Sequence, residues 1–125
     1  MKKITAKFFL TDAGNQPVRD WLRGLDKSDS KIIGEDIATV ELGWPIGMPV
    51  CRKVGNKGIK EVRSSIRNGK VEARVYFGID GGTMVLLYYS DGKSDQQNDI
   101  KVAEKHWSTY KLRKKGKSHE QRNQS

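Results

Sequence analysis

The sequence predicts a single α+β domain in which helices pack on an antiparallel sheet. Its 125 residues suit one domain with a modest core. Residues 59–77 alternate between apolar and polar side chains around Asn68-Gly69, the strongest short hairpin signal. Apolar residues at helical spacing precede and follow this region. The predicted order is an N-terminal strand, two helices, a three-strand antiparallel meander and a C-terminal helix.

The first part of the chain is predicted to form the strand and both early helices. Residues 4–10 alternate well enough for a strand. Pro17 suits the first turn of a helix because its φ is fixed, and apolar residues of 18–25 then share one face. The second helix follows residues 26–30 and stops at Gly43. The Gly- and Pro-rich stretch 43–58 is expected to be a loop.

The hairpin predicts which residues of its two strands lie opposite each other. Asn and Gly tolerate the positive φ that both positions of a type I′ turn need. A two-residue loop then places Arg63 opposite Arg74, and Glu61 opposite Tyr76. Because like charges directly opposite each other are unfavourable, this pair is typical of a site that holds an anion such as phosphate.

The period-two pattern assigns the hairpin residues to the two faces of the sheet. Glu61, Arg63, Arg74 and Tyr76 are predicted on a polar, outward face, with alternate apolar residues on the other. The helices are expected mainly on that apolar face. The third strand of the meander, TMVLLYYS, would add either Tyr88 or Tyr89 to the polar patch.

The C-terminal region is predicted to be a helix followed by a tail. Ile100, Ala103, Trp107 and Tyr110 form an apolar stripe that suits docking on the sheet. The domain is therefore expected to cover residues 1–112. Residues 113–125 are basic with few apolar side chains, so they are expected to be disordered.

Composition bears on the choice of partner and compartment. The formal net charge is +9, and segments 52–77 and 101–125 each carry eight basic and two acidic residues. Such patches bind polyanions through counterion release, although a soluble protein with a solvated tail has the same composition. The single cysteine, Cys51, suits a reducing cytoplasm. No membrane span, metal site or cofactor is expected, because the chain has neither a long apolar run nor metal-ligand spacing.

Short motifs occur in a fixed order over about residues 8–110. They are Glu61-Val62-Arg63, Ala73-Arg74-Val75-Tyr76, Leu86-Leu87, and Asp91-Gly92-Lys93 with Gln96 and Asp99-Ile100. Their order and spacing resemble the RelE/HigB-like toxins of type II toxin–antitoxin systems, in particular the addiction module killer subgroup. The resemblance implies a RelE-like fold and a ribosome-dependent mRNA endoribonuclease, or mRNA interferase, that inhibits translation in the cytoplasm.

The resemblance also implies partners and leaves two alternatives open. A toxin of this kind acts on the ribosome and its mRNA, and is neutralised by a cognate antitoxin, here expected to be a small helix-turn-helix protein. The related ParE toxins share the fold and poison DNA gyrase without being enzymes. An inactive relic of the family that only binds RNA is the third possibility.

The resemblance and the chemistry of metal-free RNA cleavage suggest roles for individual residues. The ribose 2′-hydroxyl attacks the adjacent phosphate, so the enzyme must take a proton, stabilise negative charge and protonate the leaving oxygen. Arg63, Arg74 and Lys93 are predicted to stabilise the charge, with Glu61 as base. Lys93 or Tyr76 would be the acid if cationic neighbours lowered its pKa. Alternatively, the two arginines merely pair with Glu61 and Glu72. The predicted RNA-binding residues are Lys57, Arg67, Tyr88, Tyr89, Lys111, Arg113 and Lys114.

Overall fold

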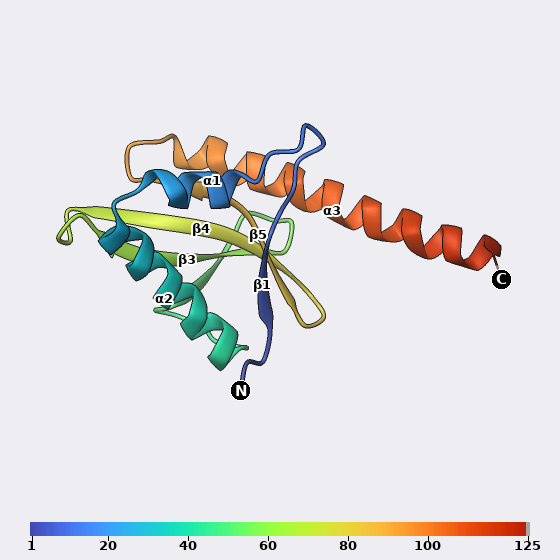
Figure 1. Ribbon diagram of the computed structural model, residues 1–125, viewed down its shortest axis with the longest axis horizontal. Coiled ribbons are helices and arrows are strands. Elements are labelled where there is room, and N and C mark those ends of the chain that lie inside the picture. Colours follow the sequence, from blue (N-terminus) through green and yellow to red (C-terminus); the bar gives the residue numbers. More distant parts are fainter. Residues whose placement is uncertain (125) are drawn as a thin grey trace.

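The computed structural model describes residues 1–124, and the side-chain environments of residues 1–116. It is one α+β domain with a five-stranded mixed sheet in the order β1-β5-β4-β3-β2 (Figure 1). The predicted fold class is therefore confirmed. The elements are β1 Thr5–Phe8, α1 Pro17–Gly24, α2 Lys27–Gly43, β2 Cys51–Val54, β3 Ile59–Ile66, β4 Val71–Asp80, β5 Thr83–Ser90 and α3 Gln96–Gln124.

Both faces of the sheet are covered by helices, whereas the sequence predicted helices mainly on one face. One core joins α1 and α2 to the sheet through residues such as Val18, Ile33 and Val75. A second core joins α3 to the opposite face through Trp107 and Tyr76. Figure 1 shows α2 and α3 on opposite sides of the strands. The face that was predicted to point outward is thus partly interior.

The register of the β3–β4 hairpin is confirmed. Arg63 lies opposite Arg74, and Glu61 lies opposite Tyr76. The turn has positive φ at Asn68 and Gly69 as predicted, and also at Arg67, where φ is 53°. The backbone N–H of Arg67 donates a hydrogen bond of 3.0 Å to a carboxylate oxygen of buried Asp29 on α2, which ties the turn to that helix.

Two strands at the edges of the sheet differ from the prediction. The expected loop 43–58 contains β2, which pairs with β3 in antiparallel fashion and places Cys51 opposite Val62. Cys51 and Val54 are buried, so packing stabilises this short strand despite its Gly-rich flanks. β1 pairs with β5 in parallel, with Thr5 opposite Thr83, and makes the sheet mixed.

Helix α3 extends beyond the predicted domain boundary at residue 112. It continues to Gln124, through a segment for which the sequence predicted disorder, and runs past the end of the sheet (Figure 1). Arg113 and Lys114 lie on the helix and have partners within the domain. Arg113 donates to the Leu10 carbonyl oxygen over 2.7 Å and pairs with Asp12, while Lys114 pairs with Asp80.

Candidate functional site

Three neighbouring strands bring arginine side chains together on the α3 face of the sheet. Arg52 on β2 lies opposite Glu61 on β3. Arg63 lies one row further along β3, opposite Arg74 on β4. Sequence reasoning missed Arg52 because the segment that contains it was taken for a loop. Cys51 and Val54 are buried in the cores on opposite faces of the sheet, so no period-two pattern marked this strand in the sequence.

Glu61 is the centre of this arginine cluster. Its side chain is fully buried, and one carboxylate oxygen lies 3.1 Å from Arg74 Nε. The other oxygen lies 3.6 Å from Arg63 Nε and 3.9 Å from Arg52 Nε. Within the described part of the chain, neither oxygen has a partner with hydrogen-bond geometry. Because a buried carboxylate is costly unless it is paired, the three guanidinium groups compensate Glu61 by their charge.

Glu72 bridges the two opposed arginines from the solvent side. One of its oxygens accepts a 3.2 Å hydrogen bond from an Arg63 NH group, and the other lies 3.6 Å from Arg74. The repulsion between the opposed arginines Arg63 and Arg74 is therefore compensated by the protein's own carboxylates. This is the alternative stated in the sequence analysis, in which the arginines pair with Glu61 and Glu72. With Arg52 included, the cluster has three arginines and two glutamates, which leaves one positive charge in excess.

The solvent exposure of the arginine side chains increases from the interior of the cluster to its surface. The Arg74 side chain is 17% exposed, Arg63 34% and Arg52 56%, while Glu72 is 47% exposed. Arg52 and Arg63 can thus meet an incoming anion directly. Glu61 cannot touch a ligand in this arrangement, so the structure gives it the position of a support for the arginines and not that of an exposed base.

Tyr76 lies beside the cluster but is fully buried, in contrast to its predicted outward position. Helix α3 covers it, and its hydroxyl lies 2.7 Å from Ser90 Oγ, which in turn donates to buried Asp99 over 2.7 Å. Burial is the main cause that raises the pKa of Tyr76, while the nearby Arg74 opposes this only in part. A tyrosine that acts as a general acid near neutral pH would need a lowered pKa.

A β-bulge at Leu87 determines which tyrosine of β5 shares the face of the cluster. Tyr76 lies opposite Tyr88 but Phe77 lies opposite Leu86, so Leu87 is the extra residue. Tyr88 packs in the second core on the α3 side. Tyr89 lies on the other face, stacked on Trp21 with ring centroids 4.4 Å apart. Of the two predicted aromatics, only Tyr88 is on the side of the arginines.

Lys93 lies in the loop that connects β5 to α3. Its N–H donates 3.2 Å to Asp91 Oδ1, and Gly92 is packed so tightly that an added Cβ would lie 2.8 Å from Val71 Cγ1. The loop therefore rests on the Val71 side chain at the start of β4, and Val71 packs against the core on the α1 and α2 side. Among the described residues, the Lys93 ammonium group has no ion-pair partner.

The other predicted RNA-binding residues do not gather at the cluster. Lys57 lies in the β2–β3 turn and Arg67 in the turn at the far end of β3. Lys111 lies over the Trp107 ring at 5.6 Å. Arg113 pairs with Asp12 in the loop between β1 and α1, and Lys114 pairs with Asp80 at the opposite end of β4. Asp80, the partner of Lys114, is six residues from Arg74 along β4, which corresponds to roughly 20 Å.

Burial raises the pKa of every tyrosine, which makes the alkaline behaviour of the protein testable. The chain has four tyrosines, and burial is the first cause of each upward shift, with Tyr110 reaching a pKa of about 12. In the unfolded chain tyrosine ionises near pKa ~10. The stabilisation that comes from keeping these hydroxyls protonated is complete below that pH and is lost as pH rises through the folded pKa values.

We therefore expect the free energy of unfolding to fall as pH rises above about 10. Tyrosinate absorbance at 295 nm should rise at higher pH in the native protein than in urea. Coincident native and denatured titration curves would contradict the burial of these hydroxyls.

No protein-family model matches the chain, and no curated protein matches it. Within the described residues, no group of three or more His, Cys, Asp or Glu side chains is placed to hold a metal ion. The described helices include none with the length and apolar character needed to cross a membrane.

Proposed function

We propose that this protein is the toxin of a toxin–antitoxin module and cleaves ribosome-bound mRNA without a metal ion. The motif order described above supports the family, and one structural observation supports the chemistry. Arg63 and Arg74 both contact Glu72 on the solvent side and Glu61 in the interior, with Arg52 beside them and one positive charge in excess. Guanidinium groups recognise carboxylates and phosphates with the same planar geometry, so Glu72 occupies the place where an RNA phosphate would bind.

In the proposed reaction, an incoming phosphate displaces the solvated Glu72 carboxylate from the two arginines. Arg63 and Arg74 then stabilise the negative charge that develops when the ribose 2′-hydroxyl attacks phosphorus. Buried Glu61 holds Arg74 in place from below. The displaced Glu72 is the carboxylate within reach to accept the 2′-hydroxyl proton, and Lys93 is the proposed donor to the leaving 5′-oxygen. Tyr88 is the aromatic on the same face.

The proposed partners are the ribosome, its mRNA and a cognate antitoxin, a small helix-turn-helix protein, all in the cytoplasm. They follow from the proposed function and not from a surface of the domain.

Induced expression in a bacterial host tests the proposal. We expect translation to stop and primer extension on a reporter mRNA to show cleavage within the translated region, while plasmid supercoiling stays normal. Relaxed plasmid supercoiling with intact mRNA would instead identify a ParE-like gyrase inhibitor. RNA binding without growth arrest would identify an inactive relic. Either of these two results would contradict the endoribonuclease proposal.

A further inference from the structure

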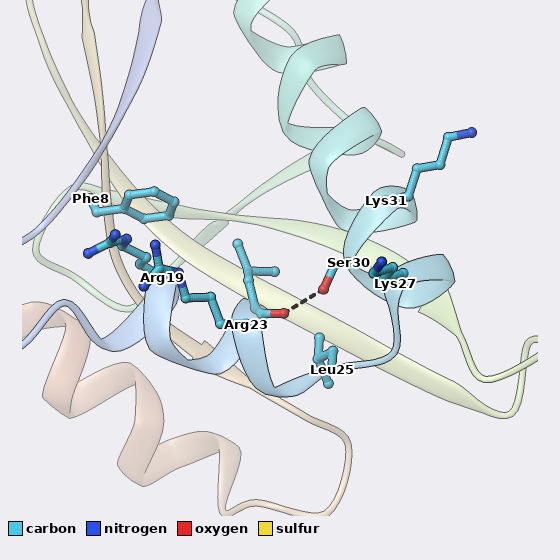
Figure 2. Close-up of a pocket in the computed structure, with 8 residues that line it drawn as sticks. Phe8, Arg19, Arg23, Leu25, Lys27, Ser30 and Lys31 are labelled. Carbon is cyan, nitrogen blue, oxygen red and sulfur yellow. Dashed lines mark hydrogen bonds between the residues drawn. The ribbon is translucent and has the colours of Figure 1, made fainter.

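A second candidate site lies on the other side of the sheet, at the β1 edge. It is an open pocket of about 590 Å³ between β1, α1 and the start of α2. Phe8, Leu22 and Leu25 supply its apolar surface. Figure 2 shows Phe8 and Leu25 together with the four basic residues that line the pocket. Phe8 belongs to the core that faces α1 and α2, so the pocket is separated from the arginine cluster by the sheet itself.

Four cations surround this apolar surface. They are Arg19 and Arg23 on α1, and Lys27 and Lys31 on α2, which places each four residues from the next. Arg19 donates a 2.9 Å hydrogen bond to the neutral Gln16 side chain. In the described part of the chain, none of the four forms an ion pair with a carboxylate. The acidic residues of these helices, Asp20, Asp29, Glu35, Asp36 and Glu41, do not line the pocket.

The corner between α1 and α2 holds the pocket in shape. Ser30 Oγ donates a hydrogen bond to the Leu22 carbonyl oxygen over 2.5 Å, which the dashed line in Figure 2 marks. Asp29, the next residue back, accepts the Arg67 N–H from the hairpin turn. The backbones of α1 and α2, which carry the two basic pairs, are therefore held relative to each other before anything binds.

We propose that this pocket binds an acidic amphipathic helix of a partner protein. Leucine or isoleucine side chains of such a helix fill the surface formed by Phe8, Leu22 and Leu25. Glutamates on the flanks of its apolar stripe pair with Arg19 and Arg23 on α1 and with Lys27 and Lys31 on α2. A nucleic-acid backbone matches the charges but leaves the apolar surface uncovered. A second copy of this chain would present the same cations, and its C-terminal region is basic as well.

A synthetic peptide provides the probe. It is an acidic 18-residue helix with leucines at i, i+3, i+4 and i+7 and flanking glutamates, compared with a shuffled peptide of identical composition that lacks an apolar face. Fluorescence anisotropy measures binding to the full chain, and amide chemical shifts locate the peptide. We expect the amphipathic peptide to bind at least about tenfold more tightly than the shuffled one, with shifts centred on residues 19–31.

Two double variants separate the pocket from general charge attraction. R23E/K27E reverses two pocket cations, and K101E/K105E reverses two exposed lysines on α3, so both change the net charge equally. We expect only R23E/K27E to weaken binding, by about tenfold or more. Leu25→Asn should weaken binding while leaving all charges in place. Circular dichroism verifies that each variant is folded.

Three results would overturn the proposal. An equal loss of peptide affinity in the two double variants would show that the peptide binds only through general charge attraction. Equal affinity for the shuffled peptide would remove the role of the apolar surface. If single-stranded RNA shifted the same amides and bound more tightly than the peptide, the pocket would be a nucleic-acid site. None of these results depends on whether the arginine cluster cleaves RNA.

Discussion

Replacing Arg63 with alanine is expected to lower the rate of mRNA cleavage about 10²- to 10³-fold, as happens when one charge-stabilising donor is removed from an active site. The side chain contacts Glu72 and Glu61, and its exposure leaves it free to meet a phosphate. In the cell, induction of Arg63→Ala should no longer arrest growth. Cleavage of a reporter mRNA, measured by primer extension at matched protein levels, provides the rate.

The fold should tolerate this change. Arg63 is 34% exposed, and its hydrogen-bonded partner Glu72 is 47% exposed, so the pair contributes only about 0–1 kcal/mol. Arg74 and Arg52 remain beside Glu61. Arg74→Ala is a less selective test, since Arg74 makes the shortest contact with the buried carboxylate and its loss would also destabilise the domain.

Lys53→Ala is the matched control for Arg63→Ala. Lys53 is exposed on β2 next to Arg52. It lies opposite Lys60 in the β2–β3 register, so its side chain points to the other face of the sheet. Its removal deletes the same charge from the residue next to Arg52 but on the opposite face of the sheet. We expect Lys53→Ala to stay toxic. A folded Arg63→Ala protein that cleaves mRNA at the unaltered rate would disprove the proposed role of the arginine cluster.

The parts of the candidate site that depend on residues close together in the chain could be predicted from the sequence. Asn68-Gly69 and the alternation around it are enough to place Arg63 opposite Arg74, because the turn sets the register and a slip by one residue would expose the apolar set. The same logic identified the apolar face that α1 and α2 cover. These features depend on residues that are close together in the chain.

The features that were missed depend on distant partners. Whether Tyr76 is exposed is decided by α3, which starts twenty residues later, and the apolar residue Ile59 on its face was the available hint. The strand β2 exists because Cys51 and Val54 find a place beside β3 in the interior. The bulge at Leu87, which separates Tyr88 from Tyr89, has no signal in the sequence of β5 alone.

Gly78→Ala is expected to destabilise the domain by about 1–3 kcal/mol, the usual cost of adding atoms to a well-packed core. Gly78 lies on β4 under the indole ring of Trp107, and an added Cβ would lie only 2.6–2.7 Å from three ring carbons. Trp107 is 7% exposed and stacks on Tyr110 with ring centroids 5.4 Å apart. The methyl group therefore forces α3 away from the sheet. Urea unfolding followed by circular dichroism measures the change.

Gly82→Ala separates this steric effect from the general effect of replacing glycine. Gly82 lies in the β4–β5 turn with nothing within 4 Å of an added Cβ, so its replacement should change stability by less than about 0.5 kcal/mol. A second comparison uses Trp107→Leu as background. If the clash with the indole is the cause, Gly78→Ala should cost less there than in the natural chain, which gives a coupling free energy between the two sites. Equal costs in both backgrounds would show that Gly78 is needed for another reason and that α3 is not seated on this strand through Trp107.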